Sequence, residues 1–344
     1  MTVMVLGIAW TIGWGADLST DIKSFSVIAL LQALINWPHF MVSYKVLYID
    51  HRDLKKHSMA MLYVPLVLFL AWFIAVYWVV IGEVVKANNY AYLIWVIAAF
   101  YLAWHYVGQT WGLVSLGILQ SGLSIHVSEL KILRGCLKVI IGWHVVWAMQ
   151  QLGHVPILTE FKSSAAMGVA NGLALASWLV CLAVFGRIYK RLGQLPEKIW
   201  APLVLLYLWY LTLWLQPVFA LFIQLSHALQ YLIFPAKVQV AKHFEKSQSD
   251  RAPVSGMSGP WGKLALTYLS CVVCGCLVFW VPVLWGKDHQ SVMILAGLLG
   301  SLVNIHHYFT DGAIWKLRDS RVRTLLLSPI PSYHPASAAK GSRA

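Results

Sequence analysis

The feature that most constrains this chain is a series of long apolar runs that recur along almost its whole length. Each run is close to the roughly 20 residues that an α-helix needs to cross the hydrocarbon core of a bilayer. The runs extend over Ser24 to Lys45, Met59 to Val85, Tyr90 to Leu119, Ile132 to Gln150, Ala166 to Tyr189, Trp200 to Gln216, Val218 to Phe234, Leu264 to Trp285 and Ser291 to Lys316. They predict an all-α fold, a polytopic transmembrane helical bundle of about nine spans, within a range of roughly eight to ten. The shorter run Val3 to Trp14 is a tenth span, a re-entrant segment or an interfacial helix, and the sequence leaves these alternatives open.

Composition excludes a water-soluble protein. Hydrophobic residues make up 59% of the chain and charged residues only 11%, whereas water-soluble domains carry roughly a quarter charged residues. Lipid is therefore the expected solvent for most of the surface.

Lys and Arg gather at alternate connections between the spans, and loops rich in these residues stay in the cytoplasm. The basic connections carry Arg52, Lys55 and Lys56; Lys131, Arg134 and Lys138; Arg187, Lys190 and Arg191; Lys237, Lys242, Lys246 and Arg251; and Lys316, Arg318, Arg321 and Arg323. This alternation predicts a cytoplasmic C-terminus, provided that the chain crosses twice between Lys198 and Lys237. The net charge of +13 then reflects topology, and no nucleic-acid partner is expected.

The chain is predicted to consist of one membrane domain and a short tail. Residues 1–316 form the transmembrane helical bundle, with a cytoplasmic loop at 236–262 that is rich in Ser, Gly and Pro. Residues 317–344 form a basic cytoplasmic tail, expected to be disordered because it has few apolar residues to bury.

Polar residues inside the spans carry the functional information, because an ionisable group in a spanning helix is costly and is a functional candidate by default. The candidate groups lie in four of the nine runs: Asn36 to His39 in the first, Trp104 to Gln109 in the third, Ser226 to Gln230 in the seventh and Asn304 to Asp311 in the ninth. These four runs cross the membrane in the same direction under the Lys/Arg rule, and in each the polar residues lie in the cytoplasmic half. The shared depth is what a single site built from four helices requires.

Helical spacing groups the polar residues further, since residues three or four apart share one face of a helix. Three pairs meet this rule: His105 with Gln109, His227 with Gln230, and His307 with Asp311. His144 lies on a run that crosses in the opposite direction, near the outer face, so it is left out of the site.

Several imidazoles and one carboxylate at one depth are typical of a metal site. This donor set suits iron, zinc, copper or manganese, and with open positions it is the pattern of non-haem iron oxygen chemistry. The predicted ligands are His39, His105, His227, His307 and Asp311, with His306 next in order. Adjacent histidines point about 100° apart on a helix, so only one of His306 and His307 is expected to face the metal. The residues expected to orient the imidazoles by hydrogen bonds are Gln109, Gln230, Asn304, Tyr106 and Tyr308. The competing interpretation is that each histidine hydrogen-bonds a neighbouring helix.

One motif resembles a known family. The run His306-His307-Tyr308-x-x-Asp311-x-x-Ile314-Trp315-Lys316 resembles the closing helix of a family of uncharacterised bacterial polytopic membrane proteins, to which Pro38-His39-Phe40 and His105-Tyr106-x-x-Gln109 are also similar. In layout, with histidines spread over several spans around an expected iron, the chain is similar to the membrane carotene-cleaving oxygenases related to bacteriorhodopsin accessory proteins. It lacks the H-x-x-H-H clusters of membrane fatty-acid desaturases and hydroxylases. The resemblance implies a location in the bacterial inner (plasma) membrane.

These observations favour a membrane-embedded, metal-dependent oxygenase, hydroxylase or desaturase, with iron as its cofactor and a membrane lipid or isoprenoid as its substrate. An electron-donor protein is an expected partner. Three alternatives stay open. They are a transporter or proton-coupled carrier with a His/Asp relay, a haem-binding electron-transfer protein with axial histidines, and an acyl- or glycosyltransferase with a histidine base.

Overall fold

The computed structural model describes residues 22–48, 54–151, 164–217, 219–250, 259–286 and 289–327, and within these ranges it is built of helices and short connections without a β-strand. The helices are α2 (Ile22–Leu31), η1 (Gln32–Asn36), α3 (Trp37–Tyr48), η3 (Met59–Tyr63), α4 (Val64–Val80), α5 (Val84–Ser121), α6 (Val127–Gln151), α7 (Ser164–Leu192), α8 (Glu197–Leu215), α9 (Phe219–Asp250), α10 (Pro260–Gly286), α11 (Gln290–Ile314) and α12 (Ser320–Leu327). The segments η1 and η3 are single π-helical turns that continue directly into α3 and α4.

The expected fold class is confirmed. Within the described ranges, nine helices are long and apolar enough to cross a membrane, and they coincide with the nine apolar runs of the sequence. The run Val3 to Trp14 lies outside the described residues. The chain is accordingly an integral membrane protein with a polytopic helical bundle.

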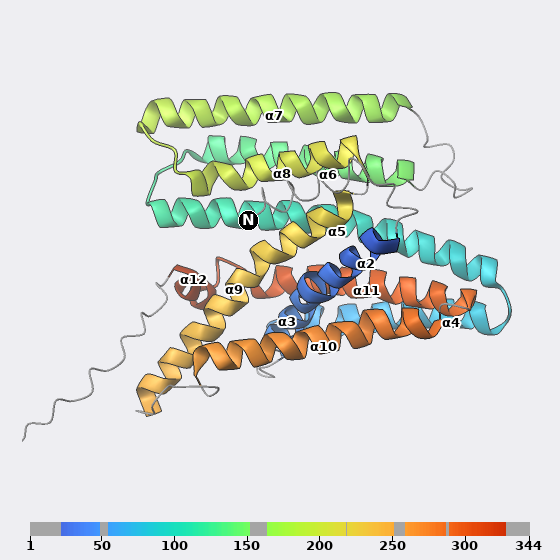
Figure 1. Ribbon diagram of the computed structural model, residues 1–344. Helices are drawn as coiled ribbons and strands as arrows, with labels where there is room; N and C mark the ends of the chain where they lie inside the picture. Colours follow the sequence, from blue (N-terminus) through green and yellow to red (C-terminus); the bar gives the residue numbers. More distant parts are fainter. Residues whose placement is uncertain are drawn as a thin grey trace, which may run out of the picture.

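The bundle consists of two groups of helices that share α5 as a common wall (Figure 1). On one side of α5 lie α6, α7 and α8; on the other lie α3, α4, α10 and α11. Helix α9 runs obliquely across both groups and contacts α8 in the first and α3 and α10 in the second. We call the end of the bundle that carries Lys56, Arg191 and Lys316 the basic end.

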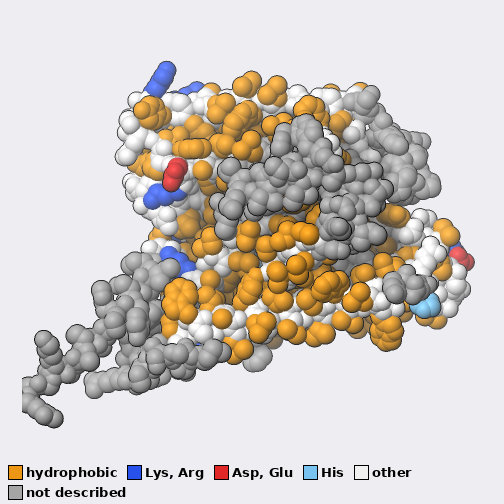
Figure 2. All heavy atoms as spheres, in the orientation of Figure 1, with side chains coloured by type: hydrophobic (Ala, Val, Ile, Leu, Met, Phe, Trp, Pro, Cys, Tyr) orange, Lys and Arg blue, Asp and Glu red, His pale blue; other side chains and the backbone are white. Residues whose placement is uncertain are grey.

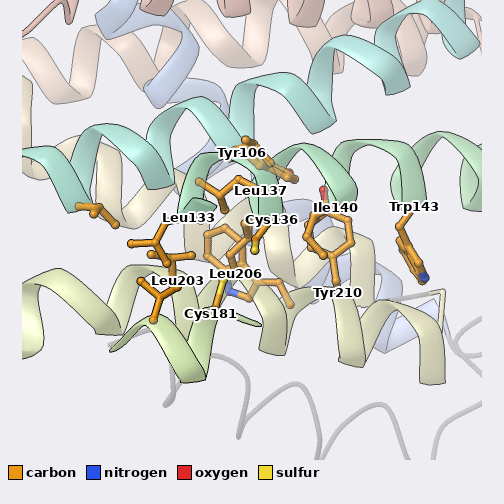
Figure 3. Close-up of a cluster of buried hydrophobic side chains, with 14 of the residues drawn as sticks. Tyr106, Leu133, Cys136, Leu137, Ile140, Trp143, Cys181, Leu203, Leu206 and Tyr210 are labelled. Atoms are coloured by element: carbon orange, nitrogen blue, oxygen red, sulfur yellow. The ribbon is translucent and has the colours of Figure 1, made fainter. Parts of the chain in front are cut away.

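The first group is held together by an apolar core, which fills the space between α5, α6, α7 and α8 (Figure 3). Its fully buried members are Val114, Leu133, Ile140, Cys181, Ile188, Ile199, Leu203 and Leu206. Helices α5 and α8 approach closely at Gly117, where an added Cβ would lie 2.4 Å from the Lys198 carbonyl oxygen. A glycine is therefore required for this crossing.

The outer surface is apolar as well. Hydrophobic side chains cover much of the visible face of the helices (Figure 2). Large hydrophobic residues stay exposed along the spans, such as Val67 at 62% and Leu175 at 61%. A soluble protein rarely exposes such extended apolar surface, so this surface fits contact with lipid chains.

Helix α3 begins with a local irregularity that follows from Pro38. Because proline has no N–H, the carbonyl of Leu34, four residues earlier, lacks the donor that a regular helix would supply. The hydroxyl of Tyr268 on α10 donates a hydrogen bond to this carbonyl instead. Helix α10 can come this close because Gly275 faces Trp37, and an added Cβ there would lie 2.6 Å from the Trp37 Cβ. The crossing fixes the start of α3, next to His39.

Two segments differ from their expected form. Helix α9 continues past Pro235 to Asp250, and α10 begins at Pro260, so much of the expected loop 236–262 is helical. The reason is that helix formers such as Ala, Lys, Gln and Glu recur after Pro235, whereas Pro and Gly return only after Asp250. In the expected tail, 320–327 forms α12, whose Leu326 carbonyl accepts a hydrogen bond from Lys237 at 2.5 Å. Residues 328–344 lie outside the described part of the chain.

Candidate metal centre

Four buried histidines meet at the centre of the bundle, each from a different helix. They are His39 on α3, His105 on α5, His227 on α9 and His307 on α11. Their candidate ligand atoms all lie within 4.8 Å of one another, and no ring is more than 7% exposed. The four apolar runs that were expected to share a site therefore do meet at one point.

The spacing of the imidazoles suits a single metal ion. Imidazole nitrogens bind a metal at about 2.0–2.1 Å, so two neighbouring ligand nitrogens lie roughly 3 Å apart. The Nε2 atoms of His105 and His227 are 2.9 Å apart. The rings of His39 and His307 lie edge to face with centroids 4.3 Å apart. The site would need only small side-chain movements to close around an ion.

A carboxylate completes the donor set. Asp311 follows His307 by one helical turn, and its Oδ2 atom lies 3.3 Å from the Nε2 of His307 and 3.6 Å from the Nε2 of His105. Its other oxygen, Oδ1, accepts a hydrogen bond of 2.8 Å from the hydroxyl of Tyr231. One carboxylate oxygen is therefore held by the protein while the other points at the histidines.

Many polar atoms of this cluster lack a hydrogen-bond partner among the described residues. They are both ring nitrogens of His39 and of His307, Nδ1 of His227 and Oδ2 of Asp311. A buried polar atom without a partner costs about 1–3 kcal/mol, and native structures contain few of them. The concentration of such atoms around one point fits the donor set of a bound metal ion, which would use their lone pairs.

Tyr231 and Ser43 support the centre from the basic side. The Tyr231 hydroxyl accepts a hydrogen bond from the indole of Trp315 and lies 2.7 Å from the hydroxyl of Ser43. The sequence analysis missed both residues, although a signal was present. Tyr231 is four residues after His227, and Ser43 is four residues after His39, so each shares a helix face with a histidine of the centre.

His306 points elsewhere. Its ring stacks on Tyr44 with centroids 4.9 Å apart, and its Nε2 atom lies 2.8 Å from the carbonyl oxygen of Ala60. Of the six residues predicted as metal ligands, the structure brings five together and places His306 against η3. The ligand role of each of the six stays a prediction.

The two tyrosines expected near the imidazoles lie there as aromatic neighbours. Tyr308 stacks on His105 with centroids 4.7 Å apart, and its hydroxyl donates to Oδ1 of Asn304 at 3.1 Å. The ring of Tyr106 lies 4.8 Å from that of His227. Asn304 thus orients Tyr308, which in turn packs against an imidazole.

A cavity of about 530 Å³ adjoins the centre. His105, Tyr231 and Asp311 line its inner end, and Lys56 and Lys316 line it at the basic end. One wall is the face of α5 that carries Tyr101, Trp104, Gly108, Gly112, Leu113 and Leu116.

The predicted glutamines lie at different places. Gln109 lines this cavity, and neither its buried Nε2 nor its buried Oε1 atom has a hydrogen-bond partner among the described residues. Gln230 is partly buried on α9 beside Tyr231.

Comparisons of the chain with protein-family models, with curated proteins and with solved structures give no significant match. The functional argument therefore rests on geometry. The fold and the centre define a polytopic membrane protein with a buried cluster of four histidines and one aspartate that could hold a metal ion.

Proposed function

We propose that this protein is a metal-dependent oxidoreductase of the oxygenase, hydroxylase or desaturase type that oxidises a lipophilic substrate within the membrane. The observation that carries this proposal is the position of the His/Asp centre at the inner end of the 530 Å³ cavity. Ligand pockets for molecules of moderate size run from about 300 to 1,000 Å³. As part of the same proposal, we assign the protein to the bacterial inner membrane with its C-terminus in the cytoplasm, which the alternation of basic loops supports.

Iron is the metal that this donor set favours. Structural zinc sites close with four ligands, whereas this centre offers four imidazoles and a carboxylate oxygen. A non-haem iron centre uses histidine and carboxylate ligands and keeps open positions. Bound iron would supply the activation of oxygen, while the chain orients the substrate and excludes water from the reacting carbon.

The cavity favours an amphiphilic substrate, such as a lipid or an isoprenoid with a polar end. Its α5 wall carries no charged side chain, and Phe234 and Phe309 add further apolar surface. Lys56 and Lys316 line the basic end, where the Lys56 ammonium is paired with Asp319 and the Lys316 ammonium can hold an anionic or polar headgroup. A substrate held in this way would extend its carbon chain towards His105 and Asp311.

A haem protein is a weaker alternative. Two axial histidines would bind iron from opposite faces of a porphyrin, so the macrocycle would have to lie between their rings. In this structure the rings of His39, His105, His227 and His307 pack directly against one another, with centroid distances of 4.3–5.2 Å. The packing leaves no slot for a macrocycle between them.

The decisive experiment compares two neighbouring histidines. The metal content and the visible spectrum of detergent-purified wild type are measured beside those of His307→Ala and His306→Ala. We expect near-stoichiometric iron without a Soret band, loss of iron in His307→Ala and its retention in His306→Ala, because only His307 faces the centre. Folded wild type without metal would overturn the proposal in favour of a proton relay, and a Soret band would favour a haem protein.

A second experiment tests the cavity. An added Cβ at Gly112 meets no atom within 4 Å, so Gly112→Leu should fold and fill part of the cavity. We expect this variant to keep its iron and to lose most of its turnover of long-chain lipids extracted from the native membrane. The matched control is Gly172→Leu on the exposed surface of α7, where an added Cβ is equally free. Equal turnover in both variants would show that the substrate binds elsewhere.

A further inference from the structure

A second cavity lies on the other side of the metal centre, away from the basic end. Its volume is about 240 Å³, and its lining includes Trp95, Trp147, Trp209, Tyr210, His144 and Tyr308. This volume is smaller than the roughly 300 Å³ at which pockets for drug-sized molecules begin. The cavity can therefore hold a single ring system but not a whole amphiphile.

Three of the side chains that line this cavity carry buried polar atoms without a hydrogen-bond partner in the described part of the chain. Both ring nitrogens of His144, the hydroxyl of Tyr210 and the indole nitrogen of Trp209 have no hydrogen-bond partner among the described residues. None of the three residues is more than 6% exposed. The indole nitrogen can only donate, the hydroxyl can donate or accept, and a neutral imidazole does one of each. The group fits a ligand with oxygen atoms that accept and hydroxyl groups that donate.

The cavity is accessible from the lipid phase. Trp95 and Leu221 line it and are also 39% and 36% exposed on the surface of the spans. A molecule dissolved in the bilayer can therefore reach the cavity from the side, without passing through water.

Only one aromatic layer separates this cavity from the metal centre. Tyr308 lines both cavities and stacks on His105 at 4.7 Å between centroids. Tyr106 lines the second cavity, and its ring lies 4.8 Å from that of His227. A ring bound here would lie next to side chains that touch two histidines of the centre.

We propose that the second cavity binds the head ring of a lipid-soluble quinone or quinol. Such a ring is flat, aromatic in size and shape, dissolved in the bilayer, and carries two oxygen atoms that are carbonyl groups in the oxidised form and hydroxyl groups in the reduced form. Trp209 and Tyr210 donate to a carbonyl oxygen, and His144 accepts from a hydroxyl group or donates to a carbonyl, according to its tautomer. The apolar tail stays in the lipid beside Trp95.

The role of this site rests on the proposed oxygenase function. Hydroxylation of a carbon–hydrogen bond by O2 needs two electrons and two protons in addition to the substrate. A quinol supplies both: R–H + O2 + QH2 gives R–OH + H2O + Q. The C–H bond and the O–O bond break, one oxygen atom enters the product and the other leaves as water, and the quinol is oxidised to the quinone. A quinol would thus act as the electron donor from within the membrane.

Binding is tested with decyl-benzoquinone as the probe and decylbenzene as the apolar control. The quenching of tryptophan fluorescence by the quinone is titrated in lipid nanodiscs, because three tryptophans line the cavity, and the affinity of decylbenzene, which does not quench, is measured by its displacement of the quinone. We expect the quinone to bind more tightly than decylbenzene to wild type. Each hydrogen bond that is removed should weaken quinone binding by about 2- to 12-fold, in Tyr210→Phe and more strongly in His144→Phe. The matched control is Tyr207→Phe, whose hydroxyl lies 2.8 Å from that of Ser177, outside the cavity lining.

The melting temperature and the iron content of the same samples are also measured. They distinguish a loss of quinone binding from a folding defect, and the quinone site from the oxygenase function. The Tyr210 hydroxyl has no partner among the described residues, so Tyr210→Phe should not lower the melting temperature. Equal affinity for the two probes, or unchanged quinone binding in both His144→Phe and Tyr210→Phe, would overturn the proposal. Quinone-selective binding to wild type that lacks iron would support this site and reject the oxygenase function. Bound iron without quinone binding would support the oxygenase function and reject this site.

Discussion

The apolar core and the metal centre are equally buried and share helix α5, yet they differ in chemistry. In the core, Leu203 and Leu206 are 0% exposed and contact other carbon side chains. In the centre, His39 and His307 are also 0% exposed, but their ring nitrogens have no hydrogen-bond partner among the described residues. The core packs carbon against carbon, whereas the centre gathers polar atoms that could hold a metal ion. The contrast separates residues that hold the helices together from residues that could bind a ligand.

The largest expected effect concerns the apolar core. Leu206→Ala removes a fully buried side chain and leaves a cavity between α8 and its neighbours, so the free energy of unfolding should fall by about 2–5 kcal/mol. Denaturant titration in mixed micelles measures this loss. Iron bound per folded molecule should stay unchanged, and a parallel loss of iron would show that the two regions are not separable.

Two close helix crossings, one in the apolar core and one beside the metal centre, allow a second comparison of the two regions. An added Cβ would lie 2.6 Å from the Trp37 Cβ at Gly275 and 2.4 Å from the Lys198 carbonyl oxygen at Gly117. Both Gly275→Ala and Gly117→Ala should destabilise the protein by about 1–3 kcal/mol through overpacking.

Only Gly275→Ala should also lower iron affinity, because Trp37 lies two residues before His39. Metal titration of the two variants checks this expectation. Similar iron affinities in both would mean that the α3–α10 crossing does not position His39.

A smaller effect is expected from the hydroxyl that holds the carboxylate. Tyr231→Phe removes the hydrogen bond to Oδ1 of Asp311, and loss of such supporting groups typically lowers metal affinity by about 10- to 100-fold. Competition with a chelator measures the affinity. The control is Tyr44→Phe, which removes a tyrosine hydroxyl bonded to the Val303 carbonyl on α11 and should leave the affinity unchanged. Equal losses in the two variants would argue against a specific role for Tyr231.

The smallest effect belongs to His306. Its Nε2 atom lies 2.8 Å from the Ala60 carbonyl oxygen, so His306→Ala removes one hydrogen bond between α11 and η3. The free energy of unfolding should fall by about 0.5–1.5 kcal/mol, as measured by the same denaturant titration. A fall as large as that of Leu206→Ala would mean that His306 does more than join two helices.

The nine spans could be predicted from the sequence because hydropathy and length decide them, with little dependence on neighbours. The shared depth of the polar residues was enough to predict that one group of side chains would meet. The structure brings together His39, His105, His227, His307 and Asp311. Depth does not fix how a helix rotates about its axis, and only packing places His307 inward and His306 outward.

Other features could not be predicted for related reasons. Tyr231 was missed because a tyrosine in a span is typical of the membrane interface, although its spacing of four residues from His227 places it on the same helix face. The second cavity lies between α5, α6, α8, α9 and α11, so it depends on how these helices pack. Their packing arrangement cannot be predicted from a single sequence. A loop was predicted after Pro235 because the polar residues there end the apolar run. Their helix propensity is nevertheless good, and α9 continues through them.

The origin of the four histidines in α3, α5, α9 and α11 has a consequence for biosynthesis. Among the described candidate spans, α3 belongs to the first and α11 is the last. While the ribosome still holds α11, a nascent chain has delivered three imidazoles to the membrane but neither the fourth nor the carboxylate of Asp311. The full donor set of four imidazoles and a carboxylate therefore forms only after α11 has entered the membrane, and a metal held by all five groups would report that this span is in place.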